Sequence, residues 1–444
     1  MNLRAQIYDA ILRDQSKAEV LLADVIKIGC LYRHYLKHTG KTRSRPERAQ
    51  DFILQEVGFA TRSRFSGYFA ETFNEYAQGY WASEGPVTYM VDGFVGDTLL
   101  EIYPVSTLDY SQTKAPNRAV LSAATKAYLQ GSPEALLVVV DRDKQAWSFW
   151  RVSGDLENAT KEIVSDIRYL EKLVANEAVP VATASESTCR RCPYQGSCTL
   201  VPSKDPPPYS VRTLKTQPAV EEQAKVEKYL WSLNAKPSHR KRNVIHPSEF
   251  SITDCDRRIA YGLMGTEEKE SIDPKLRRIF DTGHACHDVI QSTISWAIPE
   301  FRDEVPVRHD DLKIAGHCDG DLGGGEGVEI KSIGSNGFGK LKKAKKDHEK
   351  QATLYGALLD LKKIQYIYIN KETGDLAVFQ CPVDRQLWHK MAGRAANIVK
   401  TVDDGMLPPQ ITQEYKCKTC KYAWTCKPEL SEDKKPRSMR KFSR

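Results

Sequence analysis

The stretch CDGDLGGGEGVEIKSIG, residues Cys318 to Gly334, decides how the second half of this chain folds. In an extended strand alternate side chains point to opposite faces, so Glu329 and Lys331 share one face. The glycine-rich segment before them can turn one strand back beside the next, which would bring Asp319 next to Glu329. Two neighbouring carboxylates repel each other unless a cation lies between them, and Mg²⁺ or Mn²⁺ prefers such oxygen ligands. The stretch therefore predicts a divalent-metal site, although an exposed ion pair on an edge strand is the simpler reading of Glu329 and Lys331 alone.

Residues on either side of this stretch extend the predicted site. His287, in DTGHACHDVIQ on an expected helix, is a further candidate ligand. Gln351 and Tyr355 are spaced i and i+4, which places them on one face of a second expected helix. Lys331 would lie where it can orient, or help to deprotonate, a water on the metal.

Length and composition set the frame for this site. A chain of 444 residues is too long for one ordinary core and indicates two domains, while 41% hydrophobic and 28% charged residues are ordinary for a soluble globular protein. No apolar run approaches the ~20 residues of a membrane helix, and the N-terminus lacks the apolar core of a signal peptide. We therefore expect a cytoplasmic protein with no membrane partner.

Positive charge is gathered in blocks, although the formal net charge is only +7. SHRKR precedes Asn243, and six basic residues lie between Lys434 and Arg444. Blocks of this kind suit a polyanion such as DNA, and the alternative is a solvated helix face and a disordered tail. The densest block holds five lysines: Lys340, Lys342, Lys343, Lys345 and Lys346.

The cysteines reveal an internal duplication. Two segments, CRRCPYQGSC and CKTCKYAWTC, share the pattern C-x2-C-x5-C, and each lacks the fourth thiolate of a four-coordinate site. Cys30 and Cys255, each followed three residues later by arginine, precede the triplets by 159 and 162 residues. Spacing alone does not distinguish zinc from an iron-sulfur cluster. The two predicted quartets are Cys30, Cys189, Cys192 and Cys198, and Cys255, Cys417, Cys420 and Cys426.

The predicted acidic residues keep the same register. Asp92 lies 62 residues after the first upstream cysteine and Asp319 lies 64 after the second, and Glu101 and Glu329 follow at 71 and 74. VDGFVGDTLLEIYPVS, from Val91, is then the first copy of the opening strand-turn-strand. We expect homologous domains at residues 1–200 and 244–430. A proline-rich linker with a polar helical stretch would span 201–243, and a basic tail 431–444.

The motif series in the second copy resembles a known nuclease family. G-x-x-x-H ending at His287, G-x-x-D ending at Asp319, E-x-K from Glu329 to Lys331 and Q-x-x-x-Y from Gln351 to Tyr355 resemble the RecB-like branch of the PD-(D/E)xK nucleases. The cysteine frame is similar to that of the iron-sulfur members, which include the CRISPR-associated RecB-like exonucleases and the AddB nuclease domain. The resemblance covers about residues 247–430.

This resemblance implies an α/β protein of two tandem restriction-endonuclease-like domains, each a mixed central sheet flanked by helices and stapled by a four-cysteine [4Fe-4S] cluster. It implies that His287, Asp319, Glu329 and the Ile330 carbonyl hold Mg²⁺ or Mn²⁺ for DNA hydrolysis. Gln351 and Tyr355 would steady the phosphate or the neighbouring strand, while the five lysines would track the backbone of single-stranded DNA or duplex ends.

The first copy departs from the family pattern. Tyr103 stands in the place of Lys331, and the spacing pairs Ala124 with Gln351 and Tyr128 with Tyr355. Aligning SGYFAETF with TGHACHDV, which needs compensating gaps, pairs Glu71 with His287. We therefore interpret residues 1–200 as a degenerate nuclease domain kept for DNA binding or packing.

Two other classes of function stay open. One is a nonenzymatic module that binds DNA ends or a partner, and the other is a zinc-stapled assembly scaffold. The sequence leaves exonuclease against endonuclease action undecided. It also leaves open a homo-oligomer and a recombination or replication partner protein.

Overall fold

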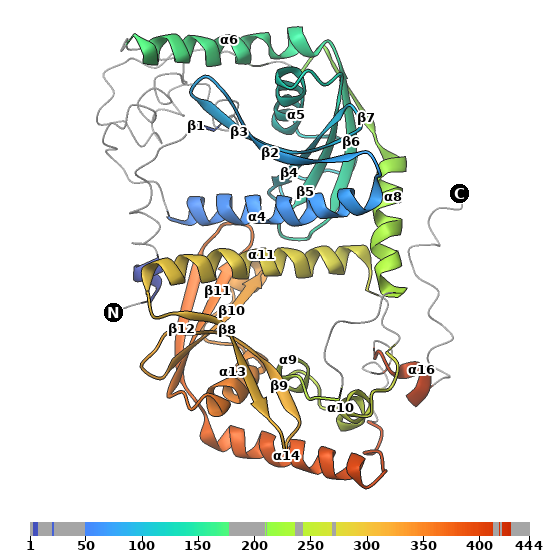
Figure 1. The fold of residues 1–444 in the computed structure, drawn as a ribbon, viewed down its shortest axis with the longest axis vertical. Helices are drawn as coiled ribbons and strands as arrows, with labels where there is room; N and C mark the ends of the chain where they lie inside the picture. Colours follow the sequence, from blue (N-terminus) through green and yellow to red (C-terminus); the bar gives the residue numbers. More distant parts are fainter. Residues whose placement is uncertain are drawn as a thin grey trace.

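The computed structural model describes residues 3–7, 20–21, 49–176, 209, 211–235, 243–268, 272–411, 417 and 420–427. These residues form two mixed sheets, one in each half of the chain, and each sheet is flanked by helices (Figure 1). The predicted α/β class is therefore confirmed. Among the described helices, none combines the length and apolar character that a membrane span requires.

The N-terminal sheet has seven strands in the order β1-β3-β4-β5-β6-β7, with β2 paired to β3. In Figure 1 α6 lies above this sheet and α4 lies below it, towards the other half, while α8 runs down the right-hand side past the ends of α4 and α11 (Pro274–Ala297). The strands are β1 (Val20–Leu21), β2 (Tyr76–Glu84), β3 (Val87–Val95), β4 (Thr98–Val105), β5 (Ala135–Asp141), β6 (Trp147–Gly154) and β7 (Leu214–Pro218). The helices are α4 (Ala49–Thr72), α5 (Asn117–Leu129), α6 (Leu156–Ala175), α8 (Val220–Ser232) and the short η3 (Leu233–Ala235).

The C-terminal sheet has five strands in the order β12-β11-β10-β9-β8. The strands are β8 (Arg302–His309), β9 (Ile314–Asp321), β10 (Glu326–Ile333), β11 (Lys363–Asn370) and β12 (Leu376–Pro382). The helices are α9 (Pro247–Phe250), α10 (Asp256–Leu263), α11 (Pro274–Ala297), α12 (Ser335–Phe338), α13 (Lys346–Leu358), α14 (Arg385–Asp403) and α16 (Ala423–Cys426).

The two sheets repeat one topology. Strands β2 to β6 and strands β8 to β12 follow the same sequence of pairings: antiparallel, antiparallel, parallel, antiparallel. In each half a helix of 13 residues lies in the connection between the two parallel strands, α5 in the first and α13 in the second, where the short α12 precedes it. This is the repeat that the cysteine spacing predicts.

Local sequence explains the elements that carry the candidate site. Asp273 caps α11 by accepting a hydrogen bond from Leu276 N, and Pro274 begins the helix with its backbone already suited to it. Gly323, Gly324 and Gly325 link β9 to β10 with φ angles of 80°, 62° and 81°, a region that residues with a Cβ adopt only at a cost. The glycine run therefore makes the tight return that joins the two strands.

Helices α4 and α11 lie side by side and join the two halves (Figure 1). Ile53 and Val57 of α4 share one apolar cluster with Ile290 and Ile294 of α11. At another position along the same two helices, the Tyr68 hydroxyl donates to Asp281. The two copies therefore share a buried core in addition to their covalent connection.

Part of the predicted linker belongs to the N-terminal sheet. Residues 214–218 form β7, which pairs antiparallel with β6. The polar stretch that follows is helical, as predicted, and as α8 it packs against both α4 and α11. The apolar side chains of Val226 and Leu230 explain this, because they are buried in the N-terminal core. Residues 428–444, with the predicted basic tail, lie outside the described residues.

Candidate functional site

The two predicted acidic residues of the second copy lie on paired strands. Asp319 is the sixth residue of β9, and Glu329 is the fourth residue of β10. The two strands are antiparallel and pair Val328 with Gly320, so Glu329 and Asp319 are the next two residues to face each other. Ile330 N donates to Asp319 Oδ2 at 2.6 Å. Both carboxylates are buried, so their charges lie largely outside the screening of water.

Lys331 is the cation that contacts this acid pair. Its Nζ forms an ion pair with Glu329 Oε1. The other oxygen, Oε2, is buried and has no partner among the described residues. Burial raises the pKa of Glu329, and Asp319 adds to this while Lys331 opposes it. Burial lowers the pKa of Lys331, but Glu329 and Asp319 outweigh it and the net shift is upward. The site therefore favours a charged Lys331, while burial makes the charged form of Glu329 costly.

Two helices bring the remaining predicted residues to the same place. His287 Nδ1, from α11, lies 3.7 Å from Asp319 Oδ1, and burial lowers the pKa of this imidazole, which favours the neutral form that binds metals. On α13, Gln351 Nε2 donates to the Tyr355 hydroxyl at 3.4 Å. Burial and the nearby Glu329 raise the pKa of Tyr355, so its hydroxyl stays protonated.

Gln291 and Glu304 belong to this neighbourhood and were not predicted from the sequence. Gln291 Nε2 donates to the Asp319 backbone oxygen at 2.8 Å and to Glu304 Oε1 at 3.0 Å. Gln291 follows His287 by one helical turn, a spacing that could have indicated it. Glu304 has a left-handed backbone, with φ of 46°, and no sequence pattern marked it.

The described residues do not enclose a metal ion in the present side-chain arrangement. No group of three or more His, Cys, Asp or Glu side chains among them gathers closely enough to do so. The metal ligand set His287, Asp319, Glu329 and Ile330 therefore stays a prediction. What the structure provides is the convergence of three of these side chains, together with Lys331, from α11, β9 and β10.

The lysine cluster leads directly into α13. All five of its side chains, at positions 340, 342, 343, 345 and 346, are exposed, and Lys346 is the first residue of that helix. The backbone N of Lys345 donates to the Tyr368 hydroxyl at 2.9 Å, and this hydroxyl also contacts His348 Nδ1 at 2.9 Å. The end of the cluster is thereby attached to β11, the strand next to the edge strand β12.

The second predicted cysteine quartet lines one small cavity. Cys255, Cys417, Cys420 and Cys426 face it together with Tyr261 and Tyr422. Burial raises the pKa of Cys420, and the neighbouring Cys255 and Cys417 add to the effect. The four thiols share this cavity without closing to metal-ligand distances. The first quartet, residues 30, 189, 192 and 198, lies outside the described residues.

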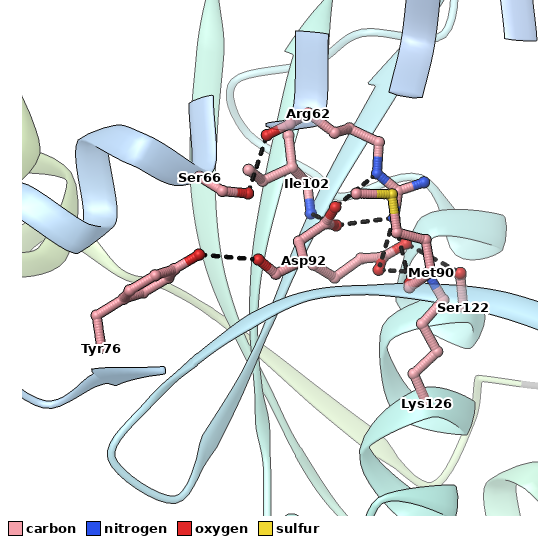
Figure 2. Close-up of polar contacts among 9 residues, drawn as sticks. Arg62, Ser66, Tyr76, Met90, Asp92, Ile102, Ser122 and Lys126 are labelled. Carbon is pink, nitrogen blue, oxygen red and sulfur yellow. Dashed lines mark hydrogen bonds and ion pairs between the residues drawn. The ribbon is translucent and has the colours of Figure 1, made fainter. Parts of the chain in front are cut away.

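The first copy holds the same acid pair in a different setting (Figure 2). Asp92 is the sixth residue of β3 and Glu101 the fourth of β4, as their counterparts are in β9 and β10. Ile102 N donates to Asp92 Oδ2 at 2.7 Å, which repeats the bond from Ile330 to Asp319. The strand-turn-strand is therefore conserved in geometry between the halves, down to a single backbone hydrogen bond.

Three of the equivalences predicted for the first copy are wrong. Arg62, not Glu71, matches His287, because each is the fourteenth residue of its helix and contacts the aspartate. Glu71 is exposed near the end of α4. On α5, Ser122 and Lys126 are the sixth and tenth residues, as Gln351 and Tyr355 are on α13, and both contact Glu101. The equivalences to Ala124 and Tyr128 fail because spacing counted from a distant cysteine adds up every intervening change in loop length.

Comparisons with known proteins give limited matches. No protein-family model and no curated protein matches this chain. Among solved structures, SSO0001 is 16% identical, with 47% of this chain and 96% of that chain covered and a TM-score of 0.30. An alkaline exonuclease, LHK-Exo from Laribacter hongkongensis, is 12% identical, with 37% of this chain and 89% of that chain covered and a TM-score of 0.30. Its complex with dAMP gives 14% identity and the same coverage and TM-score. Likenesses of this size decide neither fold family nor function.

Proposed function

We propose that this chain is a divalent-metal-dependent DNA nuclease, an exonuclease, that hydrolyses phosphodiester bonds in its C-terminal domain. The observation that carries the proposal is Glu329, whose Oε1 pairs with Lys331 while its buried Oε2 has no partner among the described residues. A buried carboxylate in this state is costly unless a cation completes its surroundings. Asp319 lies across from it, and His287 lies beside Asp319.

The residues present fit Mg²⁺ or Mn²⁺. His287, Asp319 and Glu329, with the Ile330 carbonyl, would hold the ion, because oxygen ligands with one imidazole suit these hard cations. When bound, such an ion lowers the pKa of a water and neutralises charge on a phosphate.

The remaining side chains act on the nucleophile and the phosphate. The Lys331 ammonium, already beside Glu329, would orient the attacking water and stabilise its deprotonated form. The Gln351 amide and the Tyr355 hydroxyl are hydrogen-bond donors that would steady a phosphate oxygen or the neighbouring strand. These roles follow the RecB-like resemblance of the motif series.

A cleavage assay tests the proposal. End-labelled single-stranded and duplex DNA are incubated with the full chain, purified without air, in Mg²⁺, Mn²⁺ or EDTA. We expect metal-dependent shortening from an end, which EDTA stops. Binding of both substrates without cleavage in any metal would instead support a nonenzymatic module that binds DNA ends. Both copies would then have lost nuclease activity, as we interpret the first copy to have done.

The exposed lysine cluster should set the salt dependence of DNA binding. Replacing Lys342, Lys343 and Lys345 with alanine should weaken binding and reduce the slope of log K against log salt by about 0.7–0.9 for each phosphate that is no longer neutralised. Fluorescence anisotropy at several salt concentrations measures this slope. Lys161→Ala with Lys172→Ala, two exposed lysines on α6, is the control that should leave the slope unchanged. Equal slopes in the two variants would contradict the proposal that the lysine cluster contacts DNA.

We further propose that each cysteine quartet holds a [4Fe-4S] cluster, with zinc as the alternative metal. Anaerobic protein should then contain about eight iron atoms per chain, four for each cubane cluster. Cys420→Ser should lose about half of that iron, while Cys381→Ser, outside both quartets, should lose none. Stoichiometric zinc without iron would contradict the cluster and support the zinc-stapled alternative.

A further inference from the structure

The acid pair of the N-terminal copy is fully paired by side chains of its own chain (Figure 2). Arg62 Nε and Nη2 each donate to one oxygen of Asp92, both at 2.8 Å. Lys126 Nζ donates to Glu101 Oε2 at 2.6 Å, and Ser122 Oγ donates to Glu101 Oε1 at 3.1 Å. All four carboxylate oxygens therefore have a donor.

The cluster is buried and electrically balanced. The side chains of Arg62 and Lys126 are 11% and 5% exposed, and those of Asp92 and Glu101 are 0% and 1% exposed. Arg62 also bridges the two acids, because its Nη2 lies 3.5 Å from Glu101 Oε2. Two carboxylates facing one guanidinium and one ammonium sum to no formal charge, which is the balance that a divalent cation would provide.

The two cations come from helix positions that carry other residues in the second copy. Arg62 has the helical position of His287, and Lys126 has that of Tyr355. The corresponding acid there, Glu329, pairs with Lys331 through Oε1, and its buried Oε2 has no partner in the described part of the chain. The contrast is therefore between one acid pair completed by the protein and one left incomplete, on the same strand framework.

We propose that Arg62 and Lys126 take the place of a divalent cation in the N-terminal copy and close its acid pair to metal ions. An entering ion would have to displace a bidentate arginine, which stays charged at any physiological pH, and a buried lysine. Both displaced groups would then be buried cations without their acids. The inference concerns the N-terminal copy and does not depend on cleavage by the other copy.

Metal binding to the full chain tests this. The unbound Mn²⁺ is measured by electron paramagnetic resonance in wild type, in Asp92→Asn and in Glu101→Gln. We expect the same number of bound ions per chain in all three, since the first copy takes none. One ion fewer in Asp92→Asn or Glu101→Gln would overturn the proposal. The wild-type count also reports separately on the C-terminal site, where a value of zero would contradict the proposed nuclease and leave this inference standing.

A second arm asks whether the two cations are what exclude metal. Asp319→Asn with Glu329→Gln removes the acids of the C-terminal copy and gives the background chain. In that background Arg62→His with Lys126→Tyr, which installs the residues of the other copy, should bind about one additional Mn²⁺ ion, since oxygen and imidazole ligands suit this cation. Adding Asp92→Asn should remove it again. A folded quadruple variant, by circular dichroism, that gains no ion would overturn the proposal.

Discussion

Replacing Lys331 with alanine is expected to slow DNA cleavage by about 100- to 10,000-fold, the range typical of a positioned acid-base group. The ammonium of Lys331 is the cation that contacts Glu329, and in the proposed mechanism it orients the attacking water. DNA affinity should stay close to that of the wild type, because the exposed lysine cluster is unchanged. Single-turnover cleavage and fluorescence anisotropy measure the two quantities separately.

The internal repeat supplies the matched control for this variant. Tyr103 is the sixth residue of β4, as Lys331 is of β10. Tyr103→Phe should therefore leave cleavage unchanged if the activity belongs to the second copy. Near-normal cleavage by Lys331→Ala would contradict the proposed catalytic role of Lys331. An equal loss in both variants would mean that the two halves share the activity.

Replacing Arg62 with alanine is expected to lower the free energy of unfolding by about 3–5 kcal/mol, the usual cost of removing one partner of a buried ion pair. The variant leaves Asp92 buried without its bidentate partner, and Glu101 loses the more distant interaction with the same guanidinium. The side chain of Asp92 is 0% exposed in the intact chain, and after the substitution it keeps the hydrogen bond from Ile102 N. Urea unfolding in EDTA measures the decrease without contributions from divalent ions.

Arg64 provides a control on the same helix. It forms an ion pair with Asp288 at 2.6 Å across the boundary between the copies, but the two side chains are 36% and 53% exposed. Exposed pairs contribute little, so Arg64→Ala should cost about 0–1 kcal/mol. Equal destabilisation of Arg62→Ala and Arg64→Ala would contradict the prediction that the buried ion pair of Arg62 with Asp92 contributes more to stability than the exposed pair of Arg64.

The C-terminal site was largely predictable because its signals are local. The glycine run before Glu326 specifies a tight return, and the alternation of residues in a strand puts Glu329 and Lys331 on one face. Gln351 and Tyr355 meet through an i and i+4 spacing on one helix. In each case the partners lie within a few residues of one another, or are joined by a turn whose chemistry is visible in the chain.

The N-terminal site was not predictable in the same way. Arg62 reaches Asp92 from a helix 30 residues away, and Lys126 reaches Glu101 across 25 residues. Nothing in the residues around Arg62 sets it apart from Arg64 two positions later, yet one is buried in the acid pair and the other exposed at the boundary between the copies. Local spacing cannot distinguish them, because the difference arises from which face of α4 packs on the sheet.

Alternation, turn chemistry and cysteine spacing are properties of neighbouring residues and of a repeated order along the chain. They were therefore sufficient to predict two α/β halves and the acid pair of each. The choice of cation for each pair depends on how α4, α5, α11 and α13 lie against their sheets, which is a matter of long-range packing. Only the tertiary structure could show that one acid pair is neutralised by Arg62 and Lys126, while Glu329, paired with Lys331, keeps one buried oxygen without a partner among the described residues.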